Sequence, residues 1–90
     1  MLNKYVVEFL GTLFALYIIL LSKANPIAIG AAFTLAIYLG KNISGGNFNP
    51  AVSIMLAYDG KLSNTDLLGY ILAQVFGGLA ALELYKYIKY

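Results

Sequence analysis

The chain contains apolar blocks that are long enough for membrane-spanning helices, and more polar residues separate them. Apolar residues dominate positions 5–21, 26–39 and 64–87, and more polar residues occur in the stretches between these three blocks. Long apolar blocks with few charges are typical of helices that cross a bilayer. The second block has only 14 residues, about 21 Å of helix, so it needs neighbouring helices or a locally thin bilayer. The pattern therefore predicts an all-α membrane protein with three transmembrane helices.

Residues 40–58, between the second and third blocks, have a different pattern. A glycine-containing loop over residues 40–48 is followed by Asn49 and Pro50, which suit a helix cap and a first helical position. The helix that they begin ends near residue 58, so it rises only about 13 Å, less than half of the hydrocarbon thickness. Such a short helix can exist at membrane depth only where it lines a wet cavity or is buried in protein. We expect a re-entrant half-helix beside a pore.

Composition agrees with a membrane protein and excludes several kinds of function. Of the 90 residues, 61% are hydrophobic and 11% are charged, and the net charge of +2 is too small and scattered for nucleic-acid binding. Cys and His are absent, which excludes disulfides and metal sites built on thiolate or imidazole. No nucleophile paired with a base and no phosphate-binding loop is visible. We therefore expect no enzyme, no cofactor and no metal, and a single domain over residues 1–90.

Small residues recur at four-residue spacing on two of the predicted helices. This spacing lets helix backbones approach closely in lipid. Generic packing and a specific helix interface explain it equally well. The two rows are Ala28, Ala32, Ala36 and Gly40 on the second helix, and Gly69, Ala73, Gly77 and Ala81 on the third.

Three motifs resemble those of the aquaporin and glycerol-facilitator family, the major intrinsic proteins. Residues 44–53, SGGNFNPAVS, resemble the first asparagine-proline-alanine loop of that family. Residues 7–12, VEFLGT, resemble its first-helix motif, and residues 73–78, AQVFGG, resemble its third-helix motif. Family members carry two such repeats in opposite orientations, whereas this sequence contains one. The resemblance is therefore to half an aquaporin, with three spans and one re-entrant half-helix.

The distribution of lysines favours a pore made from two copies. Lysine bias sets the orientation of a membrane protein, so an equal division between the two sides lets both orientations be populated. Together with the family's inverted repeats, this implies an antiparallel homodimer in the surrounding membrane lipid, and the family's tetramers imply further assembly into a tetramer of pores. Lys4, Lys41 and Lys61 fall on one side, and Lys23, Lys86 and Lys89 fall on the other.

The resemblance assigns the centre of the pore to Asn49, Pro50 and Ala51. The Asn49 side chain has two N–H donors for a permeating water or alcohol, while its oxygen caps the half-helix. Two half-helix N-termini that face each other would repel cations and protons. The alternative is an ordinary helix start like Asn25-Pro26, which lacks the following alanine and the glycine loop.

The resemblance also assigns roles to the loop itself. It implies that Gly45, Gly46, Asn47 and Phe48 run extended and present carbonyl oxygens to permeating molecules. Glycine is needed there because the backbone must turn sharply and lie close to the pore. Asn47 stands where the family often has histidine.

Glu8 lies inside the first predicted helix, and an intramembrane carboxylate is a functional candidate by default. In the family the matching residue accepts hydrogen bonds from backbone N–H groups of the loop. Gln74 is similarly placed, so the resemblance implies that both residues hold the loop. Proton coupling through Glu8 is the alternative.

The selectivity filter departs most from the family pattern. The family's second repeat places arginine just after its triplet, whereas that position is Val52 here and the chain has no arginine. Mapped onto two copies, Ile29 of one copy would form an apolar ring with Ile37 and Val52 of the other. Such a ring lacks strong donors and can dewet. The resemblance therefore implies a passive channel for water or small neutral solutes such as glycerol, and the apolar ring predicts loose discrimination between them.

Two other functions remain compatible with the sequence. A small dual-topology transporter would also combine a helix-one glutamate, about this length and balanced charges, although it would need no glycine loop or half-helix. A non-conducting half-repeat that co-assembles with a full-length aquaporin is the other alternative. The mutual consistency of the motifs, loop and caps argues against a decaying fragment.

Overall fold

The computed structural model describes residues 3–88, and every regular element within them is a helix. This confirms the all-α class. The four helices are α1 (Lys4–Leu21), α2 (Pro26–Gly40), α3 (Pro50–Tyr58) and α4 (Asn64–Tyr87). The start of α1 and the end of α2 each lie one residue beyond the expected bounds. Of the charged residues discussed above, Lys89 lies outside the described part.

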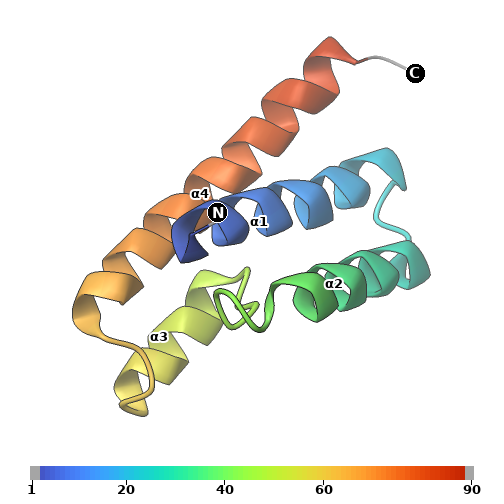
Figure 1. The fold of residues 1–90 in the computed structure, drawn as a ribbon. Coiled ribbons are helices and arrows are strands. Elements are labelled where there is room, and N and C mark those ends of the chain that lie inside the picture. Colours follow the sequence, from blue (N-terminus) through green and yellow to red (C-terminus); the bar gives the residue numbers. More distant parts are fainter. Residues whose placement is uncertain (1–2, 89–90) are drawn as a thin grey trace.

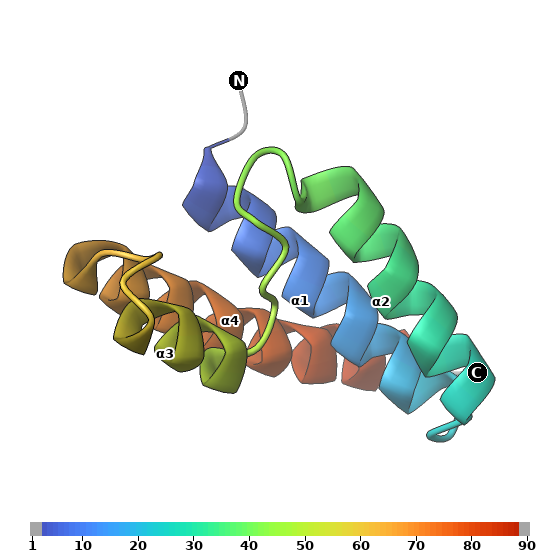
Figure 2. The same ribbon diagram turned by 90° about the horizontal axis from the view of Figure 1, so that it is seen from below.

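Helix α1 lies at the centre of the arrangement, with α2 on one side and α4 on the other (Figure 1). The short α3 packs against α4. The connection from α2 to α3 runs back across α1 before α3 begins, as Figure 2 shows. This path places the loop across one face of α1, where side chains from α1 and α4 can reach its backbone.

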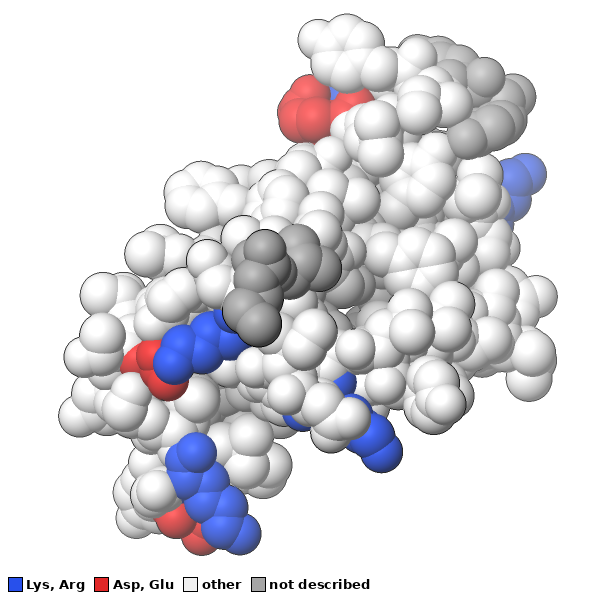
Figure 3. All heavy atoms as spheres, viewed as in Figure 1, with Lys and Arg blue, Asp and Glu red and all other residues white. Residues whose placement is uncertain are grey.

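Two of the helices are long and apolar enough to cross a membrane. These are α1, with 18 residues, and α4, with 24 residues. Helix α2 has 15 residues, so its role as a third span stays a prediction. Figure 3 shows the charged side chains in two groups near opposite ends of the molecule, separated by uncharged surface. This distribution fits a protein whose middle lies in hydrocarbon.

Local capping fixes where the helices begin. The Asn25 side chain caps α2 by accepting hydrogen bonds from the backbone N–H groups of Ile27 and Ala28, at 2.9 and 3.1 Å. The Ser63 hydroxyl caps α4 by accepting from the backbone N–H of Asp66 at 3.1 Å. These side chains satisfy backbone donors that have no partner inside the helix.

The small residues at four-residue spacing form helix contacts within the chain. Ala32, Ala36 and Gly40 of α2 are buried, as are Gly77 and Ala81 of α4. A Cβ added at Gly77 would lie 2.8 Å from the Phe9 carbonyl oxygen, so α1 and α4 approach closely at this point. Much of both rows is therefore used in packing inside one copy.

The turn between α1 and α2 generates a stability prediction. Lys23 and Ala24 have φ values of 56° and 61°, in the left-handed region that costs a non-glycine residue about 1–2 kcal/mol. Ala24→Gly should relieve this cost and raise the free energy of unfolding by about 1 kcal/mol. Chemical denaturation in detergent micelles, followed by circular dichroism, measures the change.

Ala31→Gly is the matched control, because Ala31 is an exposed residue inside α2. The same substitution there should lower the free energy of unfolding by about 1 kcal/mol. An equal loss of unfolding free energy in Ala24→Gly and Ala31→Gly would contradict the proposed backbone strain in this turn.

Candidate functional site

The loop from Lys41 to Asn49 turns sharply rather than running straight. Gly45, Gly46 and Phe48 have φ values of 92°, 64° and 52°. The expectation of an extended loop is therefore wrong at these three residues. Glycine adopts the left-handed region at little cost, whereas Phe48 must be held there by its surroundings.

A buried carboxylate holds the loop. Glu8 of α1 has no exposed surface and accepts hydrogen bonds from two loop N–H groups, those of Asn47 at 3.1 Å and Phe48 at 2.8 Å. It also accepts from the Ser44 hydroxyl at 2.6 Å and from the Gln74 side chain at 2.8 Å. None of the lysines in the described residues pairs with it. Oriented donors, rather than a cation, therefore stabilise this charge.

Gln74 joins the loop support to the half-helix. Its Nε2 donates to Glu8 and also to the Ser53 hydroxyl of α3, at 2.9 Å. The Asn47 side chain donates to the same hydroxyl at 3.0 Å. Glu8 accepts hydrogen bonds from the loop backbone, whereas Gln74 accepts none from it and acts as a donor. The two residues therefore support the loop in different ways. The network connects α1, the loop, α3 and α4 through buried groups.

The Phe48 side chain anchors the loop in the core. Its ring is 3% exposed and clusters with Val7 and Ala36. A Cβ added at Gly11 of α1 would overlap this ring, and one at Gly40 of α2 would lie 3.0 Å from it. Burial of the ring and the N–H bond to Glu8 offset the left-handed backbone at Phe48.

Asn49, Pro50 and Ala51 form the tip of α3. The Asn49 Oδ1 accepts from the Ala51 backbone N–H at 2.9 Å. Among the described residues, none accepts a hydrogen bond from the Asn49 Nδ2. The tip borders an open groove of about 400 Å³, whose lining includes Thr12, Phe33, Asn49, Pro50, Gln74 and Leu79. The tip therefore presents free amide donors at an open face.

Two buried polar atoms lie beside this groove without a partner among the described residues. They are the Thr12 Oγ1 and the Gln74 Oε1, and both residues line the groove. Buried polar atoms are usually hydrogen-bonded, so these two atoms are exceptions within the described residues.

The three residues expected at the constriction do not form a ring within one copy. Ile29 and Ile37 lie eight residues apart on α2, about 12 Å along the helix, and Val52 lies on α3. Ile29 and Val52 are half-buried, and Ile37 is exposed. An apolar ring built from them needs more than one copy.

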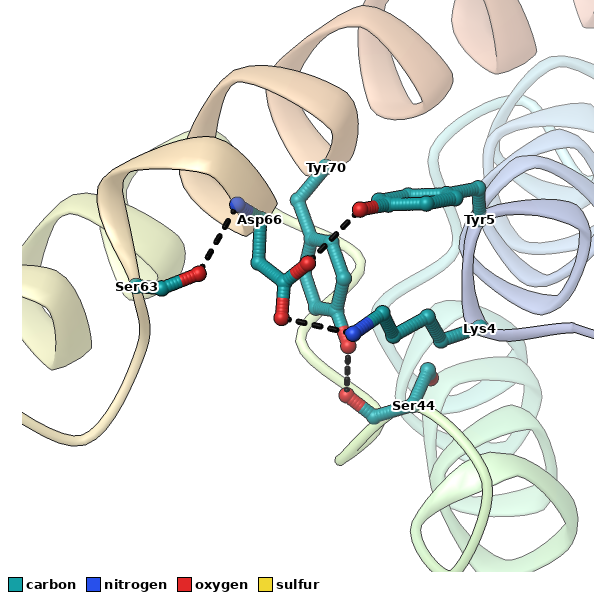
Figure 4. Close-up of polar contacts among 6 residues, drawn as sticks. All are labelled: Lys4, Tyr5, Ser44, Ser63, Asp66 and Tyr70. Carbon is teal, nitrogen blue, oxygen red and sulfur yellow. Dashed lines mark hydrogen bonds and ion pairs between the residues drawn. The ribbon is translucent and has the colours of Figure 1, made fainter.

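A second cluster supports the beginning of the loop (Figure 4). The Tyr70 hydroxyl of α4 donates to the Ser44 carbonyl oxygen at 2.5 Å. Tyr5 packs edge-on against Tyr70, with ring centroids 6.0 Å apart, and donates to Asp66 at 2.6 Å. Lys4 pairs with the other oxygen of Asp66 at 2.7 Å. Sequence reasoning missed this cluster, because its members lie more than 60 residues apart along the chain in two of these contacts.

Comparison with known proteins agrees with this architecture. Residues 1–90 match the family described as major intrinsic protein. A glycerol uptake facilitator-like protein of Lactiplantibacillus plantarum is 39% identical over 88 residues, which cover 89% of this chain and 41% of that protein. Aquaporin Z of Brucella melitensis is 39% identical over 90% of this chain and 42% of its own length. Aquaporin-8 of Notomys alexis is 39% identical over 93% of this chain and 36% of its own. The chain therefore spans about two fifths of the length of the curated relatives it matches.

The contact between Phe48 and Gly11 generates a second stability prediction. Gly11→Ala should displace the ring and lower the free energy of unfolding by about 1–3 kcal/mol. Gly30→Ala is the control, since a Cβ there meets nothing within 4 Å, and it should raise stability by about 1 kcal/mol. Thermal unfolding in detergent compares the two. A Gly11→Ala protein as stable as the wild type would contradict ring anchoring.

Proposed function

Since the chain belongs to the major intrinsic protein family, we propose that it forms a passive membrane channel for water and small neutral solutes such as glycerol. Members of this family carry water or small solutes, lie in lipid membranes and are channels rather than enzymes. The two apolar helices and the family match indicate an integral membrane protein.

The exposed amide of Asn49 is the observation that carries the proposal. Its oxygen accepts from the Ala51 N–H, while its two N–H donors have no acceptor among the described residues and the residue is exposed at the tip of a nine-residue helix. An unpaired amide is costly in hydrocarbon, so at membrane depth these donors require water or a polar solute. The buried supports at Glu8 and Gln74 keep the tip in place.

We propose that a second copy in the opposite orientation completes the path. The open groove beside the exposed α3 tip favours a partner at this face. The balanced lysines permit insertion in both orientations. In such a dimer two half-helix N-termini face each other and oppose cations and protons. Further assembly into a tetramer of pores is part of the same proposal.

The apolar ring of Ile29, Ile37 and Val52 determines the proposed selectivity. Without arginine the ring offers no strong donor and no fixed charge, so it discriminates weakly among neutral solutes. The channel should therefore be permeable to glycerol as well as to water. This proposal depends on residues from both copies.

The geometry around Glu8 favours a channel over a proton-coupled transporter. Its two oxygens accept hydrogen bonds from Ser44, Asn47, Phe48 and Gln74. Three of these four donors belong to the loop and the fourth belongs to α4, so the carboxylate is used in holding these segments together. This arrangement supports a scaffolding role for Glu8 and favours the channel over the transporter.

Reconstitution of the purified chain into liposomes tests the channel. Stopped-flow measurements should give water and glycerol permeability well above that of empty vesicles. Asn49→Asp keeps the cap oxygen but removes the amide donors, so it should lower permeability about tenfold. Asn25→Asp alters the equivalent cap of α2 and should have little effect. Absence of permeability in the wild type, or full permeability of Asn49→Asp, would overturn the proposal.

A single cysteine at the α3 tip tests the inverted dimer. The chain has no cysteine, and Ala51 is exposed, so Ala51→Cys introduces one thiol beside Asn49. Tips that meet across a two-fold axis should form a disulfide under oxidising conditions. Tyr58→Cys, at the exposed far end of α3, should not crosslink. Tips that crosslink only to an added full-length aquaporin would support the co-assembly alternative instead.

A pH gradient distinguishes the channel from the transporter. Glycerol flux through a passive channel should be the same with and without a proton gradient across the liposome membrane. Glu8→Gln places an amide among existing donors and should lower stability by about 1–3 kcal/mol. Gradient-driven accumulation of solute that Glu8→Gln abolishes in folded protein would favour the transporter.

A further inference from the structure

The polar cluster at the first turns of α1 and α4 reaches the loop through a continuous set of contacts. Asp66 lies at the start of α4 and receives one hydrogen bond on each carboxylate oxygen, from Lys4 at 2.7 Å and from Tyr5 at 2.6 Å. Figure 4 shows these side chains extending from α1 toward Asp66. The carboxylate therefore fixes the position of both α1 side chains.

Tyr5 transmits this position to Tyr70. A Cβ added at Gly69 would overlap the Tyr5 ring, so Tyr5 packs directly onto α4. Its ring meets the Tyr70 ring at 90°, with centroids 6.0 Å apart, in the edge-to-face geometry that aromatic pairs prefer. Tyr70 is 3% exposed, so its ring has little freedom to move once Tyr5 is in place.

Tyr70 in turn holds the loop at Ser44. Its hydroxyl donates to the Ser44 carbonyl oxygen at 2.5 Å. The Ser44 hydroxyl donates to Glu8 at 2.6 Å and accepts from the Gly46 N–H at 3.2 Å. Ser44 is thus fixed on its carbonyl by α4 and on its hydroxyl by α1, five residues before Asn49.

We propose that Tyr70 is a positioning residue for the pore loop, and that the Lys4–Asp66 pair acts on the loop through Tyr5 and Tyr70. This inference rests on the proposed channel function. Glu8 holds the loop at Ser44, Asn47 and Phe48, whereas Tyr70 holds the Ser44 carbonyl from α4. Loss of the Tyr70 bond lets the loop shift beside the permeation path, which changes the width available to solutes.

The ratio of water to glycerol permeability measures this effect separately from the amount of folded channel. Tyr70→Phe and Asp66→Ala should each change the ratio about threefold. Asp66→Ala keeps the cap of α4, because Ser63 accepts from the backbone N–H of residue 66. An unchanged ratio in Tyr70→Phe would overturn the positioning role.

Two control variants lie at the same end of the molecule. Tyr58→Phe removes a hydroxyl from a side chain that is 94% exposed. Asp59→Ala breaks the exposed ion pair with Lys61, whose atoms lie 3.4 Å apart. Both controls should keep the wild-type ratio, and an equal change in them would assign the effect to general surface disturbance.

A double variant tests whether Asp66 acts through Tyr70. If it does, Asp66→Ala combined with Tyr70→Phe should match Tyr70→Phe alone, because the last link is already absent. Additive changes in the permeability ratio would overturn this connection.

Hydrogen exchange measures the protection of the loop backbone and does not require the protein to conduct. In detergent-solubilised protein, the backbone N–H groups of Asn47 and Phe48 should exchange about tenfold faster in Tyr70→Phe and in Asp66→Ala, while the turn at residues 22–25 is unchanged. Unchanged exchange at the loop overturns the positioning role even if the protein conducts. Faster exchange in a protein that does not conduct supports the loop contact and overturns the channel instead.

Discussion

The rest of the structure depends on a buried carboxylate that pairs with no lysine among residues 3–88. Glu8 is stabilised by four donors, which come from the loop and from α4. Removing the loop from this site would leave a charge unsatisfied in a poorly solvating environment, which is among the largest penalties a protein can incur. The carboxylate therefore does more than attach a loop. It makes the positions of α1, the loop and α4 depend on one another.

Apolar packing complements this polar constraint at the neighbouring residue. Phe48 donates its N–H to Glu8 and places its ring against Gly11 and Gly40, from two different helices. The backbone at Phe48 is left-handed, and this conformation turns the chain so that Asn49 can begin α3. The tip of α3 is thus set by a charge on one side and by close packing on the other. An amide placed in this way keeps its donors directed outward at little further entropic cost.

Features set by local chemistry could be predicted from the sequence, and features set by distant contacts could not. Asn25 and Asn49 predicted helix starts because capping involves residues only two or three positions away. The support of the loop by Glu8 came from a family resemblance. The donor role of Gln74, the acceptor role of Ser53 and the contact from Tyr70 to Ser44 have no signature in spacing or periodicity. The left-handed backbone at Phe48 was missed because ring burial, rather than the residue type, determines it.

The order of the partners along the chain has a consequence for biogenesis. The donors to Glu8 follow it by 36, 39, 40 and 66 residues. A nascent chain that has delivered only α1 and α2 to the membrane therefore carries this carboxylate with none of its partners. Ser44, Asn47 and Phe48 become available next, and Gln74 arrives only with α4. Placing Glu8 in hydrocarbon before these donors emerge costs free energy, so the order of least cost brings the first helix to its final depth together with the last one.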